Sequence, residues 1–257
     1  MKNWIMFLCA AALMLTACEK EEPNNDDTLQ LPKVEKIPNA VTDIDGNVYD
    51  AIKIGRKVWM ASNLRTTHFA NGDTIPVGEY MDGEMPYRYA PGGNEGNVPV
   101  YGYLYNGMAA MHGANSSDAN PSGVQGVCPD GWHIPSDVEW NKMEAMLTEE
   151  DMTLDGWRGD HAILLAGGDE GTWEAANAAG EPGDYSNELR NAVSFSALPA
   201  GTYTGSYQHI GEIATFWTCS TFHEPMYWGR TIFAHSTGVQ RGPYSASMAV
   251  SVRCVRD

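Results

Sequence analysis

The stretch VCPDGWHIPSDVEW, residues 127–140, contains most of the information about how this chain folds locally. The tripeptide Pro-Asp-Gly at 129–131 has the composition of a tight turn, and the WHIP segment behind it predicts a short strand. Ser136 is a favourable helix N-cap, and Glu139, three residues later, completes a capping box. The stretch therefore predicts a strand that leads directly into a capped helix over 137–147.

Upstream of this unit, residues 41–64 predict two successive hairpins. Apolar and polar residues alternate on both sides of Asp45-Gly46-Asn47, which supplies the residue types that a hairpin turn needs. The predicted strands are 41–44 and 48–54, and a second hairpin turns at Gly55-Arg56.

The spacing of Asp43, Asp45 and Asn47 also resembles the start of a calcium-binding loop. Such a loop needs a glutamate at its twelfth position, where this chain has Ile54. The hairpin turn is therefore the preferred interpretation.

The remaining segments predict a mostly β-rich second half. YGYLYNGMAAM has the pattern of a strand running into a short helix, and MYWGRTIFAHSTGVQRG predicts a hairpin that turns near 236–238. SFSALPAGTY, ATFWTCS and the terminal AVSVRCVRD alternate like strands. We expect Trp217 and Trp228 to fill the core.

Composition limits the classes of partner. The chain has 257 residues, 43% of them hydrophobic, which is enough for one sizeable folded domain. The formal net charge of −17 argues against nucleic acids and anionic membrane surfaces, because both are bound by basic patches.

The first residues predict an exported, lipid-anchored protein. The apolar run WIMFLCAAALMLTA is short for a bilayer span and ends in LTAC, which resembles a bacterial lipobox. We expect residues 1–17 to be a signal peptide and Cys18 to carry the acyl chains that join the protein to a membrane.

The segment after the anchor predicts where in the cell the protein is located. Lys20, Glu21 and Glu22 resemble the export signal of Bacteroidetes surface lipoproteins, and residues 18–40 are expected to form a flexible acidic tether. A generic solvated tether is the alternative. The expected location is the outer membrane, facing the cell exterior, with the periplasmic face left open.

Five blocks, in this order, make the chain resemble the Fibrobacter succinogenes major paralogous domain from residue 41 to 257: VTDIDGNVYDAIKIGRKVWMASNLRT, CPDGWHIPSDVEW, NAVSFSALPAGTY, IGEIATFWTCS and SVRCVRD. GWHIPSDVEW is also similar to the RLPTEAEW junction of the formylglycine-generating enzymes, a branch of the C-type lectin-like fold. The resemblance implies an α+β, C-type lectin-like architecture with small antiparallel sheets, one or two helices and long loops.

The resemblance also implies a disulfide. Lectin-like folds often tie an early element to the last strand, which here would pair Cys128 with Cys254. Exported proteins meet conditions that allow such a bond. Cys219 is then left over, and we expect it to be a buried, unreactive thiol.

The predicted function is non-catalytic binding of a glycan, a matrix component or a protein. Aromatic side chains in loops could stack on a sugar or anchor an interface, although each could equally be part of the scaffold. The candidates are Trp157, Trp173, Tyr185, Tyr203 and Tyr207. A structural role in assembling a surface complex is the alternative, and an enzyme, either a hydrolase or an oxidoreductase, is the third possibility.

Motifs for catalysis or metal binding are missing from the sequence. There is no His-Glu-x-x-His, nucleophile elbow or phosphate loop, and the cysteines do not match the reactive pair of formylglycine-generating enzymes. EPGD at 181–184 lacks the polar residue of a calcium-dependent sugar site, and we interpret the Arg158-Gly159-Asp160 tripeptide as chance. We therefore expect no metal and no cofactor.

Overall fold

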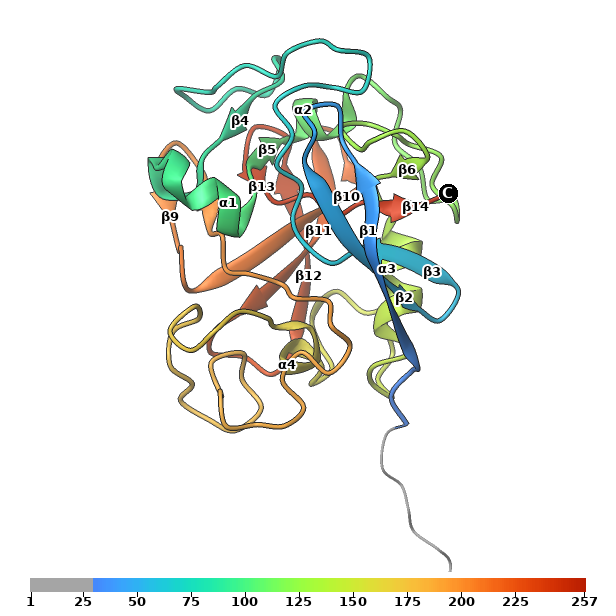
Figure 1. Cartoon of the computed structure of the whole chain (residues 1–257), viewed down its shortest axis with the longest axis vertical. Coiled ribbons are helices and arrows are strands. Elements are labelled where there is room, and N and C mark those ends of the chain that lie inside the picture. Colours follow the sequence, from blue (N-terminus) through green and yellow to red (C-terminus); the bar gives the residue numbers. More distant parts are fainter. Residues whose placement is uncertain (1–29) are drawn as a thin grey trace, which may run out of the picture.

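The computed structural model describes residues 30–257 as a mixed α/β protein with three small antiparallel sheets and short helices (Figure 1). The predicted signal peptide, Cys18 and the export residues Lys20, Glu21 and Glu22 lie outside the described residues. Within residues 30–257, no helix is both long and apolar enough to cross a bilayer.

The first sheet joins the two ends of the described chain. Its order is β1-β2-β3-β14-β6, with strands β1 (Val34–Thr42), β2 (Val48–Ile54), β3 (Lys57–Met60), β14 (Val255–Arg256) and β6 (Trp132–His133). Both predicted hairpins are confirmed, and Val255 pairs with Trp59 on one side and His133 on the other. The last strand, β14, thus lies inside this sheet, between β3 and the edge strand β6.

Strand β1 begins earlier than expected and corrects the predicted boundary of the tether. Residues 34–40, which were predicted to be part of the tether, belong to β1, and residues 34–37 pair with β2. The strand was missed because Pro38 and a register shift between Ile37 and Val41 interrupt the apolar–polar alternation that predicts a strand. Asn39 has a φ of 50°, and its amide donates to the Asp50 carboxylate at 2.8 Å.

The second sheet contains the longest described strand, β10, and has the order β10-β11-β12-β7. Its strands are β10 (Ile213–His223), β11 (Met226–Phe233), β12 (Val239–Ser245) and β7 (Gly156–Arg158). The predicted hairpin that turns near 236–238 is confirmed by the β11–β12 pairing. The short β7 was not predicted, and it joins the sheet by pairing with β12.

The third sheet has the order β4-β5-β13-β8-β9. Its strands are β4 (Arg88–Tyr89), β5 (Leu104–Asn106), β13 (Ala249–Val250), β8 (Thr202–Tyr203) and β9 (Tyr207–Gln208). The predicted strand-to-helix transition is confirmed, since β5 runs directly into α2 (Gly107–Met111).

The strand predicted over 194–203 is wrong except at its end, in β8. Ser194 and Ser196 have φ values of 55° and 56°, which no extended strand allows. The backbone turns here so that the carbonyls of Phe195 and Ser196 accept hydrogen bonds from the buried Arg253 guanidinium. The remaining described helices are α1 (Val98–Tyr101), α3 (Asp137–Glu144), α4 (Ala162–Leu165) and the 3₁₀ turns Pro91–Gly93 and Glu95–Asn97.

Helix α3 starts where the sequence predicts. The Ser136 side chain accepts from the Glu139 amide, and the Glu139 carboxylate accepts from the Ser136 amide. On its buried face, the Trp140 ring packs 5.0 Å from Trp59 and 5.6 Å from Phe216, measured between ring centroids. The capped helix is therefore fixed to the first and second sheets by an aromatic core.

The two predicted core tryptophans have different outcomes. Trp217 is 1% exposed and fills the core, as expected. Trp228 is only half-buried and packs at the surface, where the Arg241 guanidinium lies 3.6 Å from its ring and Phe222 lies 4.8 Å away. The prediction that Trp228 fills the core is wrong, because its ring packs against the Arg241 guanidinium and the exposed Phe222.

Candidate functional site

An open groove lies where β7, β10 and β11 come together. Its volume is about 470 Å³, and its walls include Trp157, His209, Glu212, Phe233, His235 and Ser236. We call it the Trp157 groove. It combines an exposed aromatic surface with charged and polar side chains, which is a composition typical of binding sites.

The aromatic wall follows from strand geometry. In β7, successive side chains point to opposite faces, so Arg158 enters the core while Trp157 faces outward. Trp157 is 52% exposed, and its ring centroid lies 4.7 Å from that of Phe233 at the end of β11. Phe233 supports one part of the indole, and the rest is available to a ligand.

Two histidine–carboxylate pairs form the polar wall. Nδ1 of His209 lies 2.8 Å from a carboxylate oxygen of Glu212, and Nε2 of His235 lies 3.1 Å from one of Glu174. All four side chains are substantially exposed. They can therefore exchange these contacts for hydrogen bonds to a ligand at little cost.

A second layer holds His235 in place. The side-chain amide of Asn177 lies 3.0 Å from Nδ1 of His235, and because an amide NH₂ only donates, Nδ1 accepts. Nε2 then carries the hydrogen that Glu174 accepts. Behind them, the Glu181 carboxylate accepts from the backbone amides of Asn177 and Ala178 at 2.7 and 3.1 Å.

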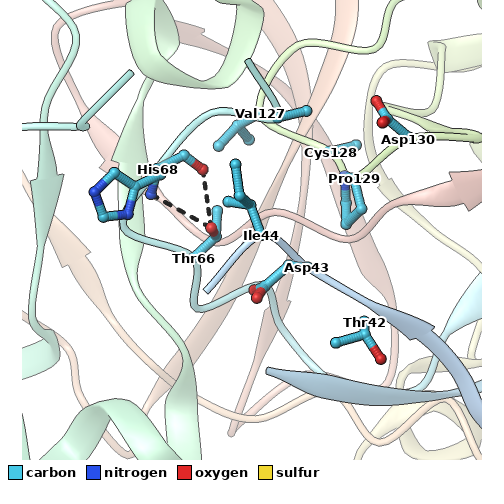
Figure 2. Close-up of a pocket in the computed structure, with 10 residues that line it drawn as sticks. Thr42, Asp43, Ile44, Thr66, His68, Val127, Cys128, Pro129 and Asp130 are labelled. Atoms are coloured by element: carbon cyan, nitrogen blue, oxygen red, sulfur yellow. Dashed lines mark hydrogen bonds between the residues drawn. The ribbon is translucent and has the colours of Figure 1, made fainter. Parts of the chain in front are cut away.

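A smaller cavity lies between the β1–β2 turn and the turn at Cys128 (Figure 2). Its volume is about 240 Å³. The Asp43 carboxylate in its wall already accepts from the amides of Asp45 and Asn47, the Asn47 side chain and the Tyr49 hydroxyl. Because these four contacts stabilise the hairpin turn, the Asp43 carboxylate has little capacity left for a ligand. We therefore prefer the Trp157 groove as the binding site.

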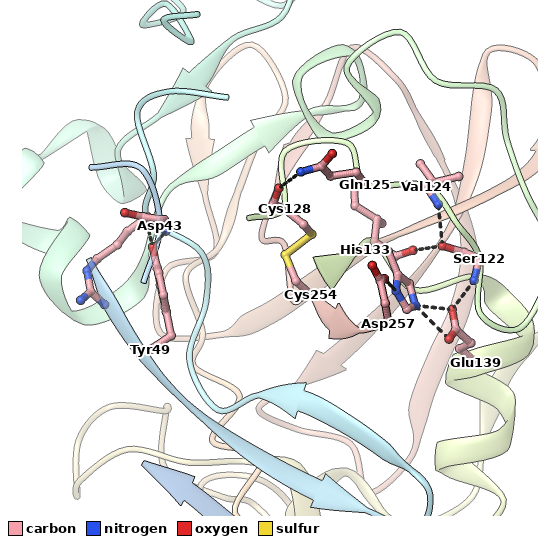
Figure 3. The surroundings of a disulfide bond; sticks show 12 residues. Asp43, Tyr49, Ser122, Val124, Gln125, Cys128, His133, Glu139, Cys254 and Asp257 are labelled. Atoms are coloured by element: carbon pink, nitrogen blue, oxygen red, sulfur yellow. Dashed lines mark hydrogen bonds and ion pairs between the residues drawn. A yellow bond between two sulfur atoms is a disulfide. The ribbon is translucent and has the colours of Figure 1, made fainter. Parts of the chain in front are cut away.

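The predicted disulfide is present and lies beside this cavity. Cys128 and Cys254 are bonded across a sequence separation of 126 residues (Figure 3). The bond connects the turn before β6 to the residue before β14. Cys219 is free and buried, and burial raises the pKa of its thiol to about 12.

A buried polar network next to the disulfide holds the C-terminus. His133 is 1% exposed, with Nε2 lying 3.0 Å from Glu139 and Nδ1 lying 2.6 Å from Asp257 (Figure 3). Glu139 also accepts from the Lys57 ammonium at 2.6 Å. Burial opposes protonation, but the two carboxylates outweigh it and raise the pKa of His133 above its usual range. The His133 and Glu139 side chains at its centre are enclosed, and the network connects parts of the scaffold.

The structure distributes the five aromatic candidates over three places. Trp157 lies in the groove. Trp173 is 1% exposed, and its backbone amide and carbonyl both hydrogen-bond the Tyr185 hydroxyl, so this pair is part of the scaffold. Tyr203 is buried, and its ring packs 4.9 Å from the partly exposed Tyr207 in the third sheet. Rings as covered as Trp173 and Tyr203 offer little face for stacking.

The residues of two other sequence motifs make structural contacts within the domain. Arg158 of the Arg-Gly-Asp tripeptide is 2% exposed and pairs with the buried Glu144 carboxylate. In EPGD, Glu181 anchors a loop as described, and a side chain on Gly183 would lie 1.9 Å from the Glu174 carbonyl. Within residues 30–257, no group of three or more His, Cys, Asp or Glu side chains could hold a metal ion.

Sequence reasoning missed the polar wall of the groove. Glu212, His209 and His235 come from segments far from β7 in the sequence, and only the unpredicted pairing of β7 with β12 brings Trp157 to them. The available signal was local: the predicted β11–β12 hairpin already placed His235 at a sheet end.

Comparison with known proteins agrees with the sequence blocks described above. A model of the Fibrobacter succinogenes major domain matches residues 52–256, which is most of the chain. No curated protein and no solved structure matches it. The chain therefore belongs to the Fibrobacter succinogenes major domain family.

Proposed function

We propose that this protein is a non-catalytic, lipid-anchored binding module of the outer membrane that faces the cell exterior and binds a saccharide in the Trp157 groove. The lipobox at Cys18 and the acidic residues behind it support the anchor and the address. A tether between the anchor and β1 would hold the domain away from the membrane surface.

The exposed indole of Trp157 is the observation that carries the saccharide proposal. A pyranose ring has an apolar C–H face that packs on an aromatic ring, and hydroxyls at its rim that need hydrogen-bonding partners. The groove supplies both, with Trp157 and Phe233 on one wall and Glu212 and His235 on the other.

We also propose that the domain is a variant of the C-type lectin-like fold. Three features support this: the first and last strands share one sheet, a disulfide ties Cys128 to Cys254, and the long stretch between α3 and β10 has little regular structure. The Trp157 groove is built partly from that stretch, the region that would correspond to a ligand-binding long loop.

The test is a saccharide array probed with residues 30–257, which contain all the described strands and the disulfide. We expect saccharide binding that survives EDTA and that weakens about tenfold or more in Trp157→Ala, as for a central aromatic anchor. Phe222→Ala is the matched control, since Phe222 is 45% exposed at the other end of the β10–β11 hairpin.

Binding that is unchanged in Trp157→Ala would overturn the assignment of the groove. An empty array would instead favour the structural alternative, in which the domain assembles with other surface proteins. Loss of binding in EDTA would show that a calcium site had been overlooked.

A further inference from the structure

The charges around the Trp157 groove have one sign. Glu212 lies in its wall, Glu174 contacts His235 from the rim, and Glu181 stands behind it with Nδ1 of His235 at 3.8 Å. No lysine or arginine lines the groove in the part of the chain that the structure describes. The two histidines of the groove each lie against one of these carboxylates, His209 at 2.8 Å from Glu212 and His235 at 3.1 Å from Glu174.

The arginines that lie near groove residues in the chain are engaged elsewhere, and two of them, Arg230 and Arg241, both pair with Asp137. Arg158, next to Trp157, is buried against Glu144 and Asn141. Arg190 donates to the carbonyls of Gly167, Gly168 and Pro182. None of these guanidinium groups is free to meet an anionic ligand in the groove.

From this charge arrangement we infer that the groove selects saccharides carrying a free amine over neutral ones, and rejects uronic and sulfated saccharides. The inference rests on the proposed function and adds the substrate class. The indole holds the apolar face of the sugar, while the ammonium group donates a charge-assisted hydrogen bond to Glu212 in the groove wall, with Glu174 a second carboxylate at the rim. An anionic sugar would place a like charge beside these carboxylates without a partner.

A series of β-1,4-linked tetrasaccharides isolates the charge. The probes are the tetramers of glucosamine, N-acetylglucosamine, glucose and mannuronate, titrated by calorimetry against residues 30–257. We expect the glucosamine tetramer to bind roughly twofold to fivefold more tightly than the neutral tetramers for each exposed ion pair formed. We expect the mannuronate tetramer to bind worst, and the difference to shrink in about 1 M salt.

Glu212→Gln is the decisive variant. It should lower affinity for the glucosamine tetramer, raise affinity for the mannuronate tetramer and leave the neutral tetramers within about twofold. Glu35→Gln removes the same charge from an exposed position on β1 and should change none of these affinities. This control excludes a general effect of the negative net charge of the protein.

The outcomes separate this inference from the proposed function. The charge selection is wrong if the tetramers bind through Trp157 with affinities that do not follow their charge. It is also wrong if Glu212→Gln and Glu35→Gln have the same effect. In both cases the groove remains the saccharide site. If no tetramer binds, or if binding ignores Trp157→Ala, the saccharide groove itself is wrong.

Discussion

Glu139 connects several parts of this protein. Its carboxylate caps α3 by accepting from the Ser136 amide, pairs with the Lys57 ammonium, and faces Nε2 of the buried His133. Since both ring nitrogens of His133 face carboxylate oxygens, both can donate only when the imidazole is protonated. At this scale, one glutamate connects β3, β6, α3 and, through His133, the C-terminal Asp257.

This arrangement predicts how stability depends on pH. The folded-state pKa of His133 is raised above 6.5, so its contribution is fully present below pH 6.5 and is lost as the pH rises through the folded value. Burial raises the pKa of Glu139, but its hydrogen bonds with His133 and Lys57 outweigh this and hold the pKa below 4.5. Its contribution is therefore lost below pH 4.5 as the pH falls through the lowered value.

We expect His133→Gln to lose about 1–3 kcal/mol at pH 6, because it leaves the buried Glu139 carboxylate short of a charged donor. The variant should also lose the decline in stability that the native protein undergoes above pH 6.5. Urea unfolding at pH 6 and pH 8 measures both. His223→Gln, at an exposed position, is the control. A native-like slope in His133→Gln would contradict this role.

At the scale of elements, the strand–helix unit at 127–140 was predictable because its signals are local. A turn tripeptide, a short aromatic strand and a capping box all lie within one short stretch, and the structure has each of them. The region 194–203 was not predictable in the same way. Its backbone turns around the Arg253 guanidinium, which arrives from the far end of the chain.

The capping box gives a prediction for α3. Ser136→Ala removes the acceptor for the Glu139 amide, and it also removes the hydroxyl that donates to the Ala119 carbonyl at 2.7 Å. We expect a loss of about 1–2 kcal/mol in the free energy of unfolding, measured by urea denaturation at pH 7. Ser206→Ala, on an exposed turn, should change it by less than about 0.5 kcal/mol. Equal effects of the two substitutions would contradict the role of the cap.

At the scale of the whole molecule, the chain closes on itself. The last residues were predicted as one strand, with Val250, Val252 and Cys254 on one face. All three are buried in the same core, but the strand is divided into β13 and β14, which belong to different sheets. Alternation identified which residues are buried, and it carried no information about the sheet that each segment joins.

The disulfide fastens this closure. Replacing Cys128 and Cys254 with serine opens a loop of more than 100 residues, and chain entropy predicts a loss of about 4–5 kcal/mol. Urea unfolding of the variant and of the reduced native protein should agree. In the folded form of residues 30–257, the raised pKa of Cys219 and its burial should prevent alkylation at pH 8, and a single thiol should react after non-reducing unfolding. A variant as stable as the native protein would contradict this account.

The groove is a whole-molecule property, because Trp157, Glu212 and His235 come from separate parts of the chain. The sequence therefore identified Trp157 as a candidate but not its polar neighbours. The proposed function depends on contact between the exposed Trp157 indole and the ligand.

The most direct measurement is an NMR titration of residues 30–257 with the glucosamine tetramer, observing the tryptophan indole N–H signals. We predict that the Trp157 signal moves in a saturable way while those of the core residues Trp59 and Trp140 stay in place. Saturable shifts elsewhere that leave Trp157 unchanged would contradict the account.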